Sequence, residues 1–299
     1  MTEKISLGPV LFHWGPEALR DFYFRIADEA SVDTVCVGEV VCGKRLPFVL
    51  AYLDEVIGRL ERAGKEVVIS SLALVVTEQD QEQIRDVTVT NDRLVEANEL
   101  GTAQRLAGRP HIIGPFVNVY NEDTLAFLQR RGAVRVCPPP ELPAAAIEVL
   151  ARAGIVELEV LVFGRLPLAI SSRCYHARHH GLSKAQCRFV CGRDPDGMTI
   201  RTLDGEPFLA INGTQTLSFN CCNLLADLNT LRRMGVKRFR LSPHYLDMVA
   251  VADIFRNTLD GRLEARQALE RLSALVGDIP FSNGFFRGTE GRALALAQP

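Results

Sequence analysis

The chain has 299 residues, of which 47% are hydrophobic and 23% are charged, as in an ordinary globular protein that buries one large core. Its formal net charge of −2 excludes a general electrostatic attraction to nucleic acid or to an anionic membrane, so any such affinity must be local. We find neither a secretory signal nor an apolar run long enough to span a membrane. These features predict a cytoplasmic protein.

Short apolar, β-rich runs alternate with stretches of helical periodicity along most of the chain. A helix is predicted over 16–30, where Pro16 suits the first turn, and another over 46–63, which ends at Gly64. This alternation favours an α/β fold, an irregular or incomplete (β/α)8 TIM-like barrel forming a single domain over 1–299, with an open doubly wound sheet as the alternative. The predicted strands cover residues 5–12, 33–39, 66–76, 93–97, 111–118, 133–137, 156–163 and 237–242.

Residues 164–222 interrupt this alternation. They are rich in Gly, Ser, Arg, His and Cys, with turn signals at 194–197 and 204–205 and a β-rich stretch over 207–219. We interpret them as a cysteine-rich, cluster-binding insertion after the seventh strand. Because the loops that follow barrel strands build the functional face, this insertion is expected to lie over the site.

Four of the eight cysteines occur in two polar segments. Cys42 follows the strand predicted over 33–39, whereas Cys174, Cys187 and Cys191 lie in the insertion. In a reducing compartment such a group indicates metal binding more than disulfides. Sulfur-only ligation favours zinc or an iron-sulfur cluster, and the spacing does not separate the two. If the segment from Cys187 to Cys191 is helical, its i, i+4 spacing places both sulfurs on one face.

Plainer interpretations exist for these and for neighbouring residues. Free cysteines are often simply buried, and we prefer that interpretation for the other four, Cys36, Cys137, Cys221 and Cys222. Histidines of the insertion are second-choice ligands in place of a cysteine, namely His176, His179 and His180.

The insertion is also basic, since residues 165–201 carry seven positive and two negative side chains, a balance of +5. These charges would stabilise an anionic metal centre and raise its reduction potential. The alternatives are a phosphate- or RNA-binding patch and a solvated basic loop.

Several stretches carry a family resemblance. The run Glu159–Pro167, continuing to Ser171–Cys174, resembles the signature of the collagenase-like U-type peptidase family. The opening Leu7–Leu11, the loop Gly38–Arg45 and the segment Asn118–Asn121 are similar to those family members that act in oxygen-independent ubiquinone biosynthesis. The resemblance extends over nearly the whole chain.

What this resemblance implies is specific. It implies a TIM-like barrel, a heterodimer with a UbiU-like protein that carries its own cluster, and hydroxylation of ubiquinone precursor rings without O2. It also implies an accessory lipid-carrier protein that presents the precursor. Reducing equivalents must come from outside, since no glycine-rich dinucleotide motif follows a strand. By position, the implied ligands of a 4Fe-4S cluster are Cys42, Cys174, Cys187 and Cys191.

The chain departs from the peptidase signature at two positions. Phe163 stands where the signature has a His, and Pro167 where it has a Cys. A general base or nucleophile is therefore missing, no H-E-x-x-H motif occurs, and peptidase activity is not expected. The alternatives to a hydroxylase subunit remain a collagenase-like peptidase and an RNA-binding or RNA-modifying protein, whose affinity would fall with salt.

Eight further polar residues follow predicted strands or flank the cysteine loops, where barrel active sites are built. Each also has a structural alternative, such as balancing thiolate charge or accepting from arginine. The aromatic and glycine-rich run over 281–288 either closes the barrel mouth or packs as core or as a partner interface. The polar candidates are Glu39, Lys44, Arg45, Asn118, Tyr120, Glu141, Glu159 and Arg173.

Overall fold

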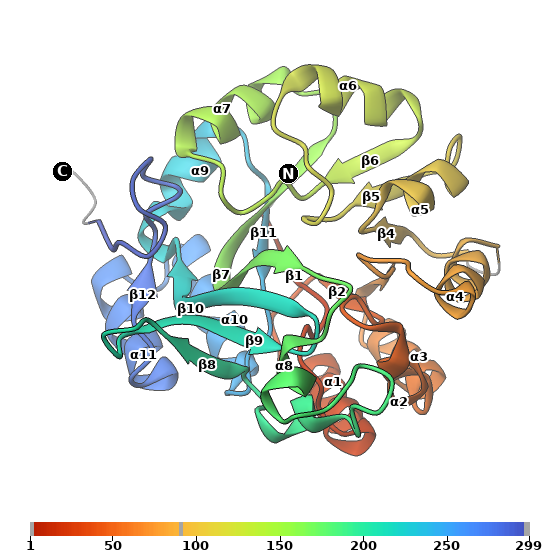
Figure 1. Ribbon diagram of the computed structural model, residues 1–299. Helices are drawn as coiled ribbons and strands as arrows, with labels where there is room; N and C mark the ends of the chain where they lie inside the picture. The colour runs from red at the N-terminus through yellow and green to blue at the C-terminus, as the bar shows by residue number, and fades with distance from the viewer. Residues whose placement is uncertain (1–2, 90–91, 296–299) are drawn as a thin grey trace.

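The computed structural model describes residues 3–89 and 92–295 and shows a closed barrel of parallel strands surrounded by helices (Figure 1). The ring runs β11-β1-β2-β3-β4-β5-β6-β7 and closes because β11 also pairs with β7. The TIM-like barrel is confirmed and the open sheet is wrong. The ring strands are β1 (Lys4–Leu7), β2 (Thr34–Val37), β3 (Glu66–Ser70), β4 (Val95–Ala97), β5 (His111–Ile113), β6 (Ala133–Val136), β7 (Glu157–Ile170) and β11 (Arg238–Leu241).

All eight predicted strands occur in the ring, but several predictions run past the strand ends. The ranges 5–12, 66–76 and 111–118 continue beyond β1, β3 and β5, because the chain stays apolar in the loops after these strands. The domain prediction over 1–299 includes residues outside the described part of the chain, and its single-domain division stays a prediction. Across residues 3–89 and 92–295, no helix has both the length and the apolar character needed to cross a bilayer.

Helices cover the outside of the ring. The helix predicted over 16–30 is confirmed as α1, which begins at Pro16 and buries Tyr23 and Ile26. The helix predicted over 46–63 is divided, because Tyr52 leaves the helical region with φ −131° and its ring lies beneath the guanidinium of Arg20. The bounds are α1 (Pro16–Glu29), α2 (Leu46–Leu50), α3 (Leu53–Arg62), α4 (Glu78–Val89), α5 (Leu100–Arg105), α6 (Glu122–Arg130), α7 (Ala144–Ala153), α8 (Tyr175–His179), α9 (Leu228–Met234), α10 (Met248–Leu259) and α11 (Ala265–Val276).

The predicted insertion begins within β7, because this strand continues past residue 164. The first half of β7 pairs with β6 and β11, and its second half continues to Ile170 against antiparallel β10 (Gln215–Asn223). The predicted boundary at residue 164 thus falls inside one strand, whose backbone groups stay paired beyond the ring. The sheet continues through β9 (Pro207–Asn212) and β8 (Met198–Arg201), and β12 (Phe281–Ser282) joins β10 (Figure 1).

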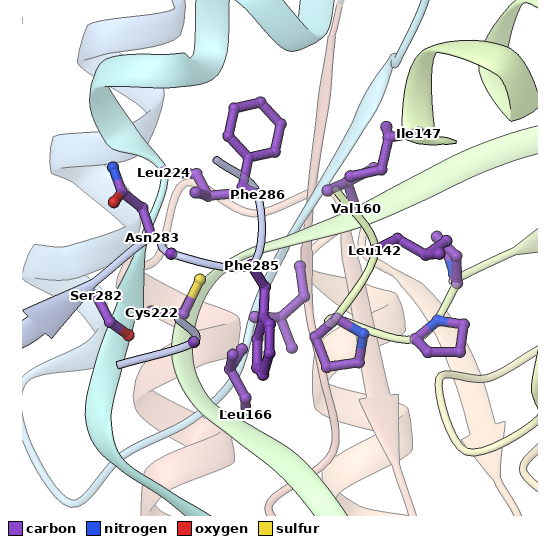
Figure 2. A pocket seen from close by; sticks show the side chains of 16 residues that line it. Leu142, Ile147, Val160, Leu166, Cys222, Leu224, Ser282, Asn283, Phe285 and Phe286 are labelled. Atoms are coloured by element: carbon purple, nitrogen blue, oxygen red, sulfur yellow. The ribbon is translucent and has the colours of Figure 1, made fainter. Parts of the chain in front are cut away.

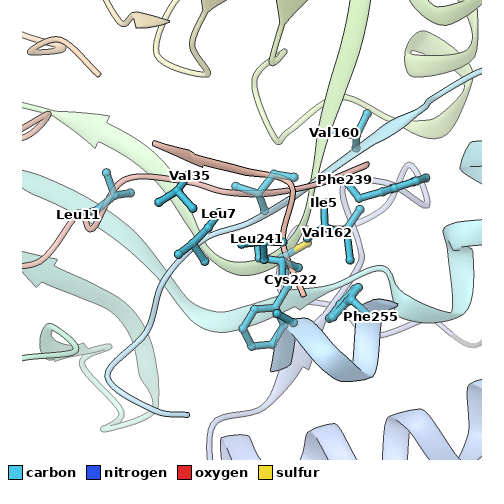
Figure 3. Packing of buried hydrophobic residues seen from close by; sticks show 14 of the residues in the cluster. Ile5, Leu7, Leu11, Val35, Val160, Val162, Cys222, Phe239, Leu241 and Phe255 are labelled. Carbon is cyan, nitrogen blue, oxygen red and sulfur yellow. The ribbon is translucent and has the colours of Figure 1, made fainter. Parts of the chain in front are cut away.

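The main hydrophobic core lies between the ring and the helices. Figure 3 shows Ile5, Leu7 and Phe239 from neighbouring strands packed close to Phe255 of α10. Alternate residues point to opposite faces of a strand, so the intervening side chains enter the barrel. The four remaining cysteines are buried, as expected: Cys222 and Cys221 in this core, Cys36 in a second cluster with Val68 and Ile112, and Cys137.

Charged residues fill part of the barrel interior. Arg240 of β11 binds Glu159 of β7 with Nε to Oε1 at 2.7 Å, and its other arm contacts Glu96 of β4. All three side chains are buried. Glu159 therefore acts as the acceptor of a buried arginine, which is the structural alternative for that candidate.

The aromatic and glycine-rich run over 281–288, here called the aromatic tail, packs against the side of the barrel. Phe286 is buried and lies near Leu224 and Val160 (Figure 2). The cavity beside it measures only about 20 Å³, which is room for a water molecule and not for a ring-shaped ligand. The tail thus completes the core.

Candidate functional site

The loop that carries Cys42 is fixed at both of its ends. Gly38 directly follows β2 and has φ +129°. A Cβ at this position would lie 2.4 Å from the carbonyl oxygen of Ser70, so only glycine allows this close approach. The Glu39 carboxylate then accepts hydrogen bonds from the backbone N–H groups of Val41 (2.8 Å) and Cys42 (2.9 Å). Glu39 therefore positions the cysteine, and its burial raises the pKa of its carboxyl.

The other three cysteines belong to the insertion. Cys174 caps the N-terminus of α8, and its Sγ lies 3.3 Å from the carbonyl oxygen of Gly213. The segment from Cys187 to Cys191 forms no α-helix and only enters a short 3-10 helix at Val190, so the condition for the i, i+4 geometry is not met. Arg188 and Phe189 have φ of 48° and 51°, a left-handed conformation that interrupts any helix at this point.

All four cysteines nevertheless converge. Burial is the main cause that raises the pKa of the thiols of Cys42, Cys174 and Cys191. The Cys174 thiol is near enough to those of Cys42 and Cys187 for their charges to raise its pKa further, and Cys174 and Cys187 do the same to Cys191. The fold thus brings together the two segments that the sequence separates by more than a hundred residues.

Arg45 supplies a buried positive charge beneath these thiols. Its guanidinium lies within hydrogen-bonding reach of Cys191 and lowers the pKa of Cys42 and Cys191 against the effect of burial. Gly213, with φ +71°, leaves the space that this group needs, because a Cβ there would lie 2.2 Å from Nη2 of Arg45. Arg45 therefore favours the thiolate forms that bind metals.

Asn212 connects this arginine to the cysteine loop. Its side-chain oxygen accepts from Nη2 of Arg45 (2.7 Å) and from the backbone N–H of His13 (3.2 Å). Its amide nitrogen donates to the carbonyl oxygens of Cys191 (3.0 Å) and Asp194 (2.9 Å). The fully buried side chain thus holds both halves of the site in register.

Replacing Asn212 by alanine is expected to lower the free energy of unfolding by about 3 kcal/mol. The change removes the acceptor of the buried His13 N–H and one partner of the charged Arg45 guanidinium, and it removes the donor to two buried carbonyl oxygens. Urea denaturation followed by circular dichroism measures this loss. The matched control is Asn229→Ala, since Asn229 is exposed on α9, and it is expected to change stability by less than about 0.5 kcal/mol. Equal effects of both substitutions would show that Asn212 does not organise the site.

Lys44 joins the two cysteine segments directly. Its Nζ donates to the carbonyl oxygens of Lys184 (2.9 Å) and Ala185 (2.8 Å) and lies 3.8 Å from Sγ of Cys187. Arg173, by contrast, is exposed on the segment before Cys174. Among the predicted polar residues, Glu39, Lys44 and Arg45 therefore contact the cysteine site, whereas Arg173 makes no contact that places it there.

A second group of predicted residues lies at the barrel mouth. A cleft of about 270 Å³ opens beyond the carboxyl ends of β3, β5 and β6, and Asn118 and Glu141 line it together with Phe116 and Leu168. The Tyr120 hydroxyl donates to the Glu141 carboxylate, and burial together with this carboxylate raises the pKa of Tyr120 to about 12. The cleft is lined both by apolar side chains and by polar groups, including those of Asn118 and Glu141.

His13 lies against the cysteine site and is one of the residues that the sequence did not reveal. Its ring packs on Phe48 and Phe189 with centroids 4.9 and 5.6 Å away. Burial, helped by the charge of Arg45, lowers the pKa of His13 to about 4.

This lowered pKa predicts acid sensitivity. An unfolded chain protonates its histidine near pH 6.5, so between pH 6.5 and 4 the unfolded state binds more protons and stability falls as the pH falls. Urea denaturation at pH 7 and pH 5 is expected to show a smaller loss in His13→Phe than in the parent chain. The difference should stay below about 1.4 kcal/mol per pH unit, the limit for one proton. An unchanged pH dependence in the variant would contradict the assignment.

An internal ion-pair network also escaped sequence analysis, which treated 194–197 only as a turn. The Asp196 carboxylate lies 3.1 Å from Nδ1 of His244 and 3.1 Å from Nη2 of Arg165. These partners hold the pKa of Asp196 below its ordinary value although burial acts to raise it. Arg165 is therefore neutralised internally and adds nothing to a basic surface.

Comparison with known proteins places the chain in a family. Residues 20–295 match the family model described as Peptidase family U32. The chain belongs to peptidase family U32. Among solved structures, this chain is similar to that of the U32 peptidase Mk0906. The identity is 13%, the TM-score is 0.46, and the match covers 81% of this chain and 93% of that chain.

Two other solved structures are similar to the U32 chain. One is dihydropteroate synthase from Xanthomonas albilineans, with 13% identity, TM-score 0.42, and coverage of 85% and 91% of the two chains. The other is N-acetylneuraminate lyase from Mycoplasma synoviae, with 11% identity, TM-score 0.43, and coverage of 90% and 78%.

The two altered signature positions of this U32 chain offer no catalytic group. Phe163 is fully buried, with its ring between those of His244 and Phe255. Pro167 has no nucleophilic or basic atom. Neither residue can supply the base or nucleophile that peptide hydrolysis requires.

Proposed function

We propose that this U32 protein is UbiV-like: an iron-sulfur subunit that acts with a UbiU-like partner in the oxygen-independent hydroxylation of ubiquinone precursor rings. The ring oxygen then comes from an oxygen-atom donor other than O2, and the electrons are exchanged with a redox partner outside the chain. The observation that carries the proposal is the convergence of Cys42, Cys174, Cys187 and Cys191 beside the buried charge of Arg45. These four thiols are the proposed ligands of one 4Fe-4S cluster. The resemblance of the sequence to the ubiquinone branch of the family supplies the substrate.

A zinc ion and a 4Fe-4S cluster require different spacings of the four sulfur atoms. Zinc sits about 2.3 Å from each sulfur, so four tetrahedral thiolates lie about 3.8 Å from one another. Across residues 3–89 and 92–295, the group of three or more potential ligand atoms within 4.8 Å of one another is formed by His176, His180 and Asp194, and not by the cysteines. A cluster with an iron at each of four corners suits more widely spaced thiolates.

The electrostatics of the site suit an anionic centre. Four thiolates around an oxidised 4Fe-4S core leave a net negative charge. Arg45 is buried against Cys191, and Lys44 reaches Cys187. A bound cluster supplies one-electron transfer, and because cysteines would occupy all four irons, we assign it electron relay or structural support and not direct substrate binding.

The cleft at the barrel mouth is the proposed place for the precursor ring. Its apolar walls include Phe116, Leu168 and Ile170, and Asn118 and Glu141 add polar groups. A flat aromatic ring fits such a surface through its faces, while hydroxyl substituents need the polar groups. An accessory lipid-carrier protein would present the precursor, whose isoprenoid tail stays outside the cleft.

The test is anaerobic purification of the chain, alone and together with a UbiU-like protein. A brown absorption that dithionite bleaches, about four irons and four sulfides per chain, and a stable complex that hydroxylates a ubiquinone precursor without O2 would support the proposal. A colourless chain that holds zinc or no metal even after anaerobic reconstitution would overturn it.

Arg45 is expected to tune the reduction potential of the cluster. Arg45→Met removes a buried positive charge that stabilises the more negative, reduced state, so the potential should fall. A redox titration followed by electron paramagnetic resonance measures the change. Arg193→Met is the matched control, because Arg193 is exposed on the same loop as Cys191 and water and salt screen its charge. A potential equal to that of the parent in Arg45→Met would argue against this role.

A further inference from the structure

Beside the cysteines lies a second group of metal-binding side chains that the cluster does not use. His176 belongs to α8, His180 follows this helix, and Asp194 follows the short 3-10 helix Val190–Arg193. One donor atom from each of the three residues lies within 4.8 Å of the other two. The three side chains therefore converge from two segments of the insertion.

The hydrogen bonds of His176 leave one nitrogen available. Its Nδ1 lies 3.3 Å from the carbonyl oxygen of Ile211, which can only accept, so Nδ1 carries the proton. In the neutral ring the Nε2 lone pair then points away from that carbonyl, and Nε2 has no hydrogen-bond partner although the side chain is fully buried. Instead it lies 3.0 Å from Oδ2 of Asp194. At this distance either a proton on Nε2, which makes a hydrogen-bonded ion pair, or a metal ion bound by both atoms relieves the repulsion of the two lone pairs.

The surroundings hold these groups in place. His176 and His180 are four residues apart, so they share one side of the helical turn, and their rings stack with centroids 5.5 Å apart. The backbone of Asp194 is anchored because its carbonyl oxygen accepts from Asn212 at 2.9 Å. His180 is exposed and Asp194 is partly exposed, which gives an ion a path from solvent.

We propose that His176, His180 and Asp194 bind a divalent first-row transition metal ion, separately from the four cysteines. Two imidazoles and one carboxylate suit zinc or ferrous iron better than the hard cations Mg²⁺ and Ca²⁺, which prefer oxygen ligands. Three protein ligands leave coordination positions open, as in catalytic and not in closed structural sites. The hydrogen bond from Nδ1 to a carbonyl is the outer contact that ligating histidines commonly make.

Cobalt(II) is the probe, added to the anaerobically purified full chain with its cluster in place. We expect one Co²⁺ per chain by metal analysis after desalting, with weak visible d–d bands and without the intense sulfur-to-cobalt charge transfer that cysteine ligation produces. Zinc should displace the cobalt. Free thiolates in a chain without its cluster would bind cobalt themselves, so a second sample has the four cysteines replaced by serine. This sample should give the same weak bands and stoichiometry, without the cluster absorption.

Matched variants decide the assignment. His180→Ala and Asp194→Asn should each weaken binding at least tenfold, whereas His179→Ala, at the exposed neighbouring position, should bind as the parent does. Circular dichroism and the cluster absorption show whether each variant keeps its fold. A parent chain that binds no cobalt would mean that His176 and Asp194 form an ion pair only, and this would overturn the proposal. Binding that survives in both His180→Ala and Asp194→Asn, or that shows sulfur charge transfer, would overturn it as well.

Discussion

Replacing Cys187 by alanine is expected to abolish the brown absorption of the anaerobically purified protein. The same result is expected for Cys42, Cys174 and Cys191, because a 4Fe-4S cluster that loses one of four thiolates exposes an iron to water and is readily lost. Iron and acid-labile sulfide should fall from about four per chain to well below one. Visible absorption, with iron and sulfide assays on the same samples, measures the effect.

The matched control is Cys137→Ala, since Cys137 is fully buried and its charged neighbours are Arg240, Glu159 and Glu96 and not the four cysteines. This variant should lose some stability through a small cavity and still contain the complete cluster. Retention of iron in any one of the four ligand variants would remove that cysteine from the proposed set. Loss of iron in Cys137→Ala, with the fold intact, would show that iron content does not report on ligation.

The second large effect is expected inside the barrel. Arg240→Met leaves Glu96 and Glu159 buried without their shared cation, and this should cost about 3–5 kcal/mol of the free energy of unfolding. Both carboxylates would then have to take up protons or admit water. Urea denaturation followed by circular dichroism measures the loss, and low yield of soluble protein is an expected accompaniment.

Two further variants test the cause of this loss. Arg266→Met removes an arginine whose side chain on α11 is 92% exposed, so it should cost less than about 0.5 kcal/mol. The triple variant Arg240→Met, Glu96→Gln, Glu159→Gln removes the unpaired charges and should recover part of the stability. A triple variant no more stable than Arg240→Met would show that packing by the arginine, and not its charge, is what matters.

Local patterns in the sequence predicted most of the architecture. The eight ring strands and α1 follow from apolar runs and from a proline at a helix start, because these signals depend only on neighbouring residues. The break at Tyr52 was not predictable, since it depends on packing between α1 and the segment before α3. The extension of β7 to Ile170 likewise depends on pairing with β10, which lies 45 residues or more along the chain.

The residues of the candidate site also fall into those that the sequence indicated and those that only the structure revealed. The sequence by itself selected the four cysteines, because thiols in polar, basic surroundings contrast with Cys36 and Cys137 in apolar strands. It also placed Glu39, Lys44 and Arg45 near them, since these residues share a loop with Cys42. That these thiols hold a metal centre, and which one, stays a prediction.

Only the tertiary structure decided how these residues meet. Asn212 bonds to His13 across 199 residues of sequence and to Arg45 across 167, and no local pattern marks such partners. The same holds for Asp194, which read as part of a turn and faces His176 in the fold. Local signals set secondary structure and residue chemistry, whereas long-range packing sets which charges and donors lie together, because it depends on the closed barrel as a whole.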